Sequence, residues 1–487
     1  MKKIYLSLAL ALCCAIHTQA AVSINDVIGA YSGTLTIGGT PETGNIIILP
    51  SSATNRITLV LPDFTYMGGN LGDIVVANIQ MSTSGNVGIN NYVLYLSELV
   101  THASISSDRT TSKLTGSTAA LTLTIQVPNL PNIPVSFSGN RVATDLQLPN
   151  AGFEENWHTV NSGVEPDGWH SFESCTAASN FLQRNARGHN QLVSSSDVRP
   201  GSTGSTSALI KAYSIIGVIA NGNLTSGQIN AGSASATSTD NHAFSSPTNT
   251  GYNTPFTAQP DSFVFWAKFI PGNSSHEARM HSVITTNARY QDPEEKDYSD
   301  VKIAEATLNY KATNGWKRLS APFVYSTSVA ATEAAYILNT FSTNKTPGVG
   351  SESDQVYLDD IELIYNYQLD NFTFDGSQVS FNNGAASVNK PYSDSIYTYS
   401  TAANGKGAKA LVGFDGANNC VVVYVLAADF ASQPTHHNVY SVQLTAPVTG
   451  LAENAIYADK ASKVVENGQI YILRGEKCYD LLGKRIR

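Results

Sequence analysis

The feature that most constrains this chain is a succession of short apolar or alternating runs separated by turn residues. In the first domain-sized stretch such runs cover residues 33–37, 45–49, 56–61, 74–79, 92–96, 121–127 and 133–138. Clusters of Gly, Asn, Pro and Ser stand between them, as at 38–39 and 68–70. Strands this short, at this spacing, are typical of antiparallel sandwiches and barrels. No helical periodicity of useful length interrupts them, so the sequence predicts an all-β fold.

The composition supports this class and argues against others. Only 14% of the residues are charged and 42% are apolar, while Ser, Thr, Asn and Gly supply much of the remainder. This balance excludes disorder driven by high net charge and suits strands with polar, uncharged surfaces. The net charge is −9, and tight basic clusters occur only at the two ends of the chain. Because phosphate binding needs clustered Lys and Arg, we expect no nucleic-acid partner.

The first twenty residues have the layout of a secretory signal peptide. Lys2 and Lys3 precede an apolar run that ends at Ile16, and small residues at Thr18 and Ala20 mark a cleavage site. The run is shorter than the roughly 18 apolar residues needed to span a bilayer. Later segments are also too short or too polar to cross a membrane. We therefore expect an exported protein without a transmembrane segment, located in the periplasm, at the outer-membrane surface or outside the cell.

Two shifts in composition divide the rest of the chain. Tryptophan and histidine become frequent near residue 140, and all four tryptophans lie before residue 365. Strand signals in this middle part occur at 261–269, 279–285, 316–325, 335–340 and 355–365, while Ser/Thr/Gly-rich stretches at 194–207 and 225–250 indicate long loops. After residue 366, strand signals occur at 372–379, 396–399, 408–413, 420–426 and 439–444.

These shifts predict three domains after the signal peptide of residues 1–20. We expect a β-barrel at 24–139, a jelly-roll β-sandwich at 140–365 and a small immunoglobulin-like β-sandwich at 366–446. A C-terminal tail follows at 447–487.

Three stretches resemble known families or segments. The segments Tyr31-Ser32-Gly33-Thr34-Leu35 and Met67-Gly68-Gly69-Asn70-Leu71-Gly72-Asp73-Ile74 resemble the calycin-like β-barrel domain of secreted Bacteroidetes proteins. The middle part resembles the "putative carbohydrate metabolism domain" of gut Bacteroidetes, through landmarks at 150–154, 166–169, 221–227, 263–269 and 356–361. The second resemblance implies a jelly roll similar to carbohydrate-binding modules, with a polysaccharide or other glycan as partner. The tail from Ile470 to Lys484 looks like the C-terminal sorting segments of exported Bacteroidetes proteins, with a plain terminal hairpin as the alternative.

Sugar recognition by flat aromatic rings makes Trp266 a candidate ligand-binding residue. Alternation along 263–269 places Phe263, Phe265 and Phe269 on one face and Trp266 on the other. If the phenylalanines fill the core, the indole of Trp266 is free to stack on a sugar. The alternative is that Trp266 packs under a covering loop.

Three further residues could line a pocket built from loops. Trp157, His158 and Trp169 follow predicted strands or turns near the start of the middle domain. Burial in the core is the alternative for both tryptophans, since tryptophan is highly buried on average.

The resemblance also implies a structural calcium ion held by Glu154, Asp359 and Asp360. Calcium takes roughly six to eight oxygen ligands, which carboxylates and carbonyls supply. Asp359 shares its strand face with apolar residues, and an unpaired buried carboxylate is costly, so it needs a partner. A Lys, Arg or backbone amide is the alternative to the metal.

No local motif of catalysis is present. Acidic residues cluster at 292–300, but a charge run that contains proline is typical of a solvated loop. The function that the sequence favours is non-catalytic carbohydrate binding in glycan capture or use. A glycoside hydrolase or other glycan-degrading enzyme, with carboxylates on loops of the middle domain, is the first alternative. A structural or adhesive surface protein is the second.

Overall fold

The computed structural model describes residues 21–446, apart from 52, 67, 97–100, 216 and 394–396, and the backbone of three strands nearer the C-terminus. The predicted signal peptide lies outside the described residues. In the described part almost all regular structure is β, which confirms the expected fold class. The α-helices there are the short α2 (Ile24–Val27) and α3 (Asn180–Ala186), and no helix among the described residues is long and apolar enough to cross a membrane.

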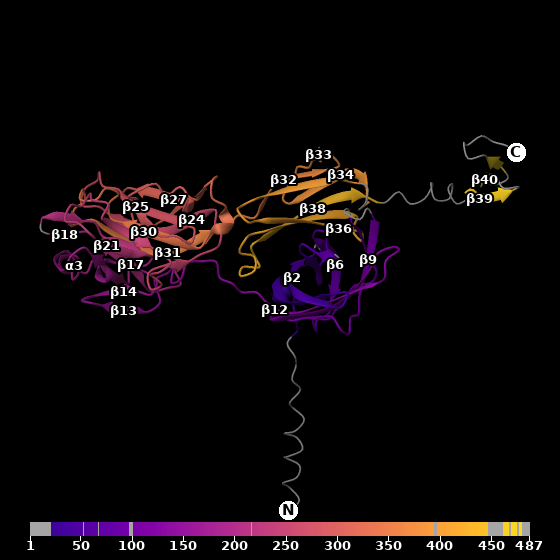
Figure 1. Ribbon diagram of the computed structural model, residues 1–487, viewed down its shortest axis with the longest axis horizontal. Helices are drawn as coiled ribbons and strands as arrows, with labels where there is room; N and C mark the ends of the chain where they lie inside the picture. Colours follow the sequence, from indigo (N-terminus) through magenta and orange to yellow (C-terminus); the bar gives the residue numbers. More distant parts are fainter. Residues whose placement is uncertain are drawn as a thin grey trace, which may run out of the picture.

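The first domain is a curled antiparallel sheet (Figure 1). Its strand order is β7-β6-β3-β2-β1-β12-β11-β9-β8, with β10 paired to β11. The strands are β1 (Gly29–Ile37), β2 (Thr40–Pro50), β3 (Arg56–Leu61), β6 (Ile74–Met81), β7 (Val87–Gly88), β8 (Tyr92–Leu96), β9 (Thr101–Ser107), β10 (Lys113–Leu114), β11 (Thr118–Gln126) and β12 (Ile133–Arg141). A small hairpin joins β4 (Thr65–Tyr66) to β5 (Gly69–Asn70). The sequence does not predict the polar strand β9. Ala103 and Ile105 are its buried apolar residues, and two such residues are too few to give a clear apolar pattern.

The middle domain consists of two main sheets around one core. One has the order β16-β17-β31-β24-β28, and the other has the order β20-β30-β25-β27-β29 with β23 paired to β30. The first contains β16 (Leu192–Ser195), β17 (Ser207–Lys211), β24 (Ser262–Ile270), β28 (Lys317–Pro322) and β31 (Gln355–Ile364). The second contains β20 (Asn223–Thr225), β23 (Thr254–Pro255), β25 (Ala278–Thr285), β27 (Lys302–Tyr310), β29 (Val324–Tyr325) and β30 (Tyr336–Ser342). Phe263, Phe265 and Phe269 lie in the shared core, as their alternation predicts.

A third, smaller sheet packs on the outer face of β25 and β30. Its order is β15-β21-β22-β26, with β15 (Thr176–Ala177), β21 (Gln228–Ala231), β22 (Asn241–Ser245) and β26 (Tyr290–Asp292). Tyr290 contacts Val283 and Leu338, which point out of the main sheet. The prediction of a long loop over 225–250 is therefore wrong in part, since β21 and β22 pair with each other there. Their polar side chains hid the strand pattern.

Smaller elements complete the middle domain. They are the hairpins of β13 (Trp157–Val160) with β14 (Gly163–Pro166) and of β18 (Tyr213–Ile215) with β19 (Val218–Ala220), and the 3-10 helices η2 (Phe172–Ser174) and η3 (Ala331–Glu333).

The third domain is a two-sheet sandwich with the orders β33-β32-β35 and β34-β38-β37-β36. Its strands are β32 (Gln368–Phe374), β33 (Ser377–Gln378), β34 (Ala385–Pro391), β35 (Tyr399–Asn404), β36 (Lys409–Asp415), β37 (Cys420–Leu426) and β38 (His437–Thr445). Farther along the chain, β39 (Ala461–Glu466), β40 (Gln469–Arg474) and β41 (Lys477–Tyr479) form a separate antiparallel sheet.

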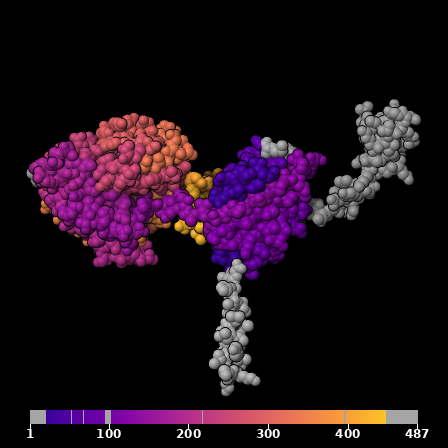
Figure 2. Space-filling view, turned by 60° about the horizontal axis from the view of Figure 1, so that its bottom comes forward, coloured from indigo at the N-terminus to yellow at the C-terminus, as the bar shows by residue number. Residues whose placement is uncertain are grey.

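The strand β37 joins the third domain to the first. Every residue of β37 is buried. Val421 and Val423 pack inside the sandwich, whereas Val422 and Tyr424 pack against the first domain. The Tyr424 hydroxyl also lies 2.8 Å from the Thr58 hydroxyl. Figure 2 shows the first and middle domains as separate lobes with third-domain surface between them.

Candidate functional site

The predicted ligand-binding residues at the start of the middle domain lie in three different environments. Trp169 is 1% exposed, and its ring centroid lies 5.5 Å from that of Phe153 in the core. Trp157 is half-buried on β13, and its indole N–H donates to the Phe153 carbonyl at 2.8 Å. His158 is exposed beside it, with Nδ1 3.1 Å from the Asp167 carboxylate. The structure therefore does not bring these three side chains together around one cavity.

Trp266 lies on the outer face of β24, as the alternation predicts. The guanidinium of Arg199 covers its ring, with Cζ 5.2 Å from the ring centroid. The neighbouring Lys268 ammonium covers the ring of Tyr357 in the same way, at 3.9 Å. On this face, half-buried aromatic rings have cations of the same chain as partners.

The three predicted calcium ligands also have protein partners. Glu154 accepts backbone N–H bonds from residues 205 and 206 at 3.0 and 2.8 Å. The Asp359 carboxylate accepts the backbone N–H of Arg199 at 2.9 Å. The Asp360 carboxylate is paired with the Arg199 guanidinium. Burial raises the pKa of Asp359 to about 6. Among the described residues, no group of three or more His, Cys, Asp or Glu side chains is arranged to hold a metal ion.

A calcium ion at this place would have to displace Arg199 from Asp359 and Asp360, and backbone amides from Glu154. The backbone amide and arginine, which the sequence left open as alternatives, are the partners seen here. Calcium binding stays a prediction that a direct measurement can test.

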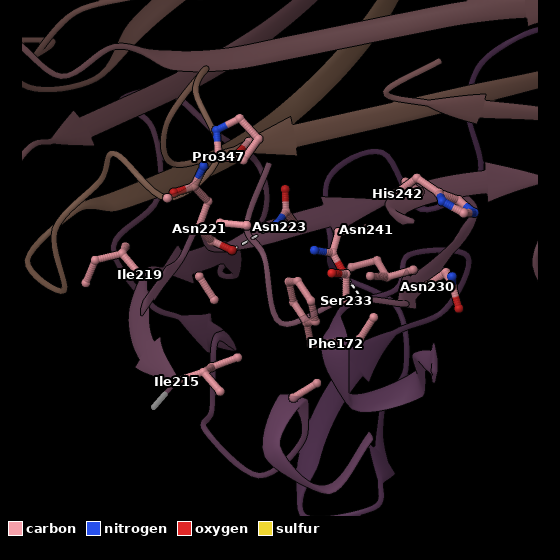
Figure 3. Close-up of a pocket in the computed structure, with 18 of the residues that line it drawn as sticks. Phe172, Ile215, Ile219, Asn221, Asn223, Asn230, Ser233, Asn241, His242 and Pro347 are labelled. Atoms are coloured by element: carbon pink, nitrogen blue, oxygen red, sulfur yellow. Dashed lines mark hydrogen bonds between the residues drawn. The ribbon is translucent and has the colours of Figure 1, made fainter. Parts of the chain in front are cut away.

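A cavity of about 290 Å³ lies elsewhere in the middle domain, between the small sheet, the hairpin of β18 and β19, and the end of β30. Figure 3 shows the ring of Phe172 between Ile215 and Ile219 on one side and Ser233 and Asn241 on the other. Small apolar residues form much of the wall: Ile219, Ala220, Ile229, Ala231, Ala234, Ala236, Ala243 and Pro347. Amide and hydroxyl side chains are set among them: Asn185, Asn221, Asn223, Asn230, Ser233, Asn241, Thr340, Ser342 and Asn344.

Three of these polar side chains carry a buried atom that has no protein partner. They are Nδ2 of Asn344, Oγ1 of Thr340 and Oδ1 of Asn221, in side chains that are 4%, 6% and 8% exposed. A buried polar atom without a hydrogen bond costs about 1–3 kcal/mol. Because none of the three atoms is accessible to water, they lie behind the cavity wall and not on its open surface.

A network of charges borders the cavity on β25. The Arg279 guanidinium makes two bonds to Asp292, at 2.8 and 2.9 Å. His281 lies between two carboxylates, with Nδ1 3.1 Å from Asp292 and Nε2 3.1 Å from Glu305. Lys302 also pairs with Glu305, at 3.2 Å.

These pairings keep both carboxylates ionised. Burial opposes the charge on Asp292, but the neighbouring His281 and Arg279 hold its pKa well below the ordinary value. The hydrogen bond from His281 lowers the pKa of Glu305 to about 2. Burial opposes the charge on His281 too, yet the Asp292 charge beside it raises its pKa overall. The expectation of a solvated loop is therefore wrong at Asp292, which is buried on β26.

The sequence does not predict this cavity, because its lining contains few of the aromatic rings and carboxylates that mark a sugar site. The available signal was the frequency of Asn, Ser and Ala over 219–243. That composition was interpreted as loop, since polar and small residues are also typical of turns.

No protein-family model matches the chain, and no curated protein matches it in sequence. Among solved structures, the chain is similar to a "putative glycoside hydrolase" from Bacteroides thetaiotaomicron, at 13% identity over 53% of this chain and 82% of the other, with a TM-score of 0.34. It is also similar to the module TmCBM61 in complex with β-1,4-galactotriose, at 10% identity over 45% and 99% of the two chains, with a TM-score of 0.21. A carbohydrate-binding module specific for non-crystalline cellulose, CBM28, matches at 10% identity over 36% and 79%, with a TM-score of 0.20. Because these TM-scores are low, the likenesses carry no argument about the site.

Proposed function

We propose that the middle domain binds a carbohydrate in the cavity without cleaving it, and that the protein is exported to capture or use glycans. The observation that carries this proposal is the lining of the cavity, in which amide and hydroxyl side chains such as Asn223, Asn230 and Ser233 are set among apolar side chains. A sugar ring presents hydroxyl groups at its edge and C–H groups on its faces, so it can satisfy both parts of this wall.

The size of the cavity supports a small part of a glycan as ligand. A volume of about 290 Å³ is at the lower end of the roughly 300–1,000 Å³ range of small-molecule sites. One sugar residue, at a chain end or as a monosaccharide, suits this volume better than a long stretch of polysaccharide. The Phe172 and His242 rings supply flat surfaces among the lining residues.

The charge network favours binding over hydrolysis. A glycoside hydrolase needs one carboxyl group that stays protonated, usually through a raised pKa, opposite a second carboxylate. Asp292 and Glu305 have lowered pKa values and are paired with cations. They therefore serve as fixed partners of Arg279 and His281 rather than as proton donors.

The test is a glycan-array screen of the full chain with a variant that fills the cavity. Ala234 is exposed at the cavity wall, so Ala234→Trp introduces bulk there without disturbing the core. The matched control is Ala330→Trp, at an exposed alanine of the same domain outside the lining. We expect the wild type and the control to bind a common set of glycans and Ala234→Trp to lose them. Equal binding by all three proteins, or binding by none, would contradict the proposal.

A further inference from the structure

We infer that the cavity takes a glycoside with an apolar aglycone, which lies against the hairpin of β18 and β19 while the sugar faces the small sheet. This inference rests on the proposed carbohydrate-binding function and names the substrate class. A glycoside of an alkyl or aryl alcohol has a hydroxyl-rich end and a hydrocarbon end. The two sides of the cavity differ in the same way.

The apolar side of the cavity consists of the hairpin and α3. Ile215, Val218 and Ile219 of the hairpin line the cavity, together with Leu182 of α3. Val218 is 39% exposed and the other three are half-buried, so their side chains keep accessible hydrocarbon surface. Ile215 lies directly opposite Val218 in the hairpin, which puts these two side chains together on one face.

The hydrophobic cores of the domain do not use these four side chains. Among the described residues, none of the four belongs to a core cluster or packs against one. The hairpin is a two-stranded sheet of its own. The Tyr213 hydroxyl at its base holds it to α3, by donating to the Asn185 and Ala186 carbonyls at 3.2 and 2.9 Å. The apolar residues nearer the turn therefore border the cavity, where an apolar group of a ligand would remove them from water.

The opposite side of the cavity, on the small sheet, offers oriented hydrogen-bonding groups. Figure 3 shows Asn230 and Asn241 across the Phe172 ring from the hairpin, and both are half-buried. Asn241 accepts the Ser233 N–H at 2.9 Å and donates to the Ser235 carbonyl at 2.8 Å. Protein partners likewise hold both ends of the Asn230 amide. Because a side-chain amide can make about four hydrogen bonds, each keeps capacity for the hydroxyl groups of a sugar.

Size and charge argue against other occupants. A volume of about 290 Å³ suits a small molecule rather than a second protein. The two cations of the lining, Arg279 and Lys345, are already paired with Asp292 and Glu277. Since neither cation is free to bind an anion, a neutral glycoside is favoured over a ligand with a carboxylate or phosphate group.

Calorimetric titration of the full chain tests the inference. The probes are the methyl, hexyl and phenyl glycosides of glucose, galactose, mannose and N-acetylglucosamine, in both anomeric forms. We expect at least one sugar whose hexyl or phenyl glycoside binds about tenfold or more tightly than its methyl glycoside, because burial of about two further methylene groups has that effect. A larger gain for hexyl indicates an alkyl aglycone, and a larger gain for phenyl indicates an aromatic one.

Two variants connect this gain to the hairpin. Val218→Thr keeps the shape of the side chain but makes it polar, and Ile215→Thr makes the opposite strand polar. Both should bring the ratio of hexyl or phenyl affinity to methyl affinity toward one. The control is Val324→Thr, because Val324 is 72% exposed in the same domain and lies outside the lining. It should leave the ratio unchanged.

The outcomes separate the two proposals. Equal affinity for the methyl, hexyl and phenyl glycosides of a sugar that binds overturns this inference and leaves carbohydrate binding intact. A gain that survives in both Val218→Thr and Ile215→Thr overturns the placement of the aglycone against the hairpin. Binding of no glycan on the array and no glycoside in the titration overturns both proposals.

Discussion

The two outer faces of the middle domain differ in how their polar and aromatic groups are partnered. On the face of β24 and β31, Arg199 covers Trp266 and Lys268 covers Tyr357. On the face of β30, amide and hydroxyl side chains border an open cavity among apolar residues. Cations of the chain itself cover the aromatic rings of the first face, whereas the polar groups of the second face border open space. The open cavity is thus a better candidate for a ligand site than the covered aromatic rings.

The largest expected effect concerns the charge pairs of the two faces. Arg279→Met leaves the buried Asp292 with His281 as its remaining charged partner, and we expect the free energy of unfolding to fall by about 3 kcal/mol. Arg318→Met, on the other main sheet, breaks a pair with Glu362 in which the side chains are 47% and 53% exposed. An exposed pair is worth about 1 kcal/mol or less. Urea unfolding of both variants measures the difference, and equal losses would contradict the comparison.

The next effect separates stability from binding at Trp266. Trp266→Ala removes a half-buried ring and its contact with Arg199, so we expect unfolding to become easier by about 2 kcal/mol. Glycan binding should be unchanged, because the ring is not part of the cavity lining. The check is a binding assay at a temperature where the variant remains folded. Loss of binding there would place the ligand on the aromatic face instead.

The two faces should also differ in their response to pH. The lowered pKa of Glu305, about 2 against an ordinary 4.5, means that the folded chain loses stability as pH falls from about 4.5 toward 2. The raised pKa of Asp359, about 6 against 3.8, has the opposite sign, since stability is lost as pH rises through that interval.

Melting temperatures measured between about pH 2 and 7 separate the two contributions, because this interval covers the titration of both carboxylates. Glu305→Gln should flatten the acid side of the profile, and Asp359→Asn should remove the fall between about pH 4 and 6. Profiles that remain parallel to the wild type would show that neither carboxylate contributes as described.

The smallest expected effect is that of calcium. Because Arg199 already pairs with Asp360 and donates to Asp359, we expect the chelator-treated and calcium-saturated chains to unfold at the same temperature. Differential scanning calorimetry measures the shift. A clear rise with calcium would show that the ion displaces the guanidinium, and that the ligand set implied by the family resemblance is correct.

Much of the fold could be predicted from local patterns along the chain. Alternation placed Phe263, Phe265 and Phe269 in the core and Trp266 outside it, because successive side chains of a strand point to opposite faces. The apolar run of β37 is continuous, so both faces of this strand are apolar and both are buried. Only the structure shows that the first domain covers one of the two faces. Periodicity is a property of neighbouring residues, so the sequence carries it directly.

The site depended on contacts that no local pattern contains. Arg199 meets Asp360 across 161 positions of sequence, and Asn221 meets the backbone of Asn344 across 123. The burial of Asp292 follows from the pairing of β22 with β26, two strands well separated in the chain. The sequence by itself determined which residues form strands and which of their faces are apolar. Only the tertiary structure decided which polar groups find partners and which border the cavity, because hydrogen bonds between distant segments depend on how the sheets pack.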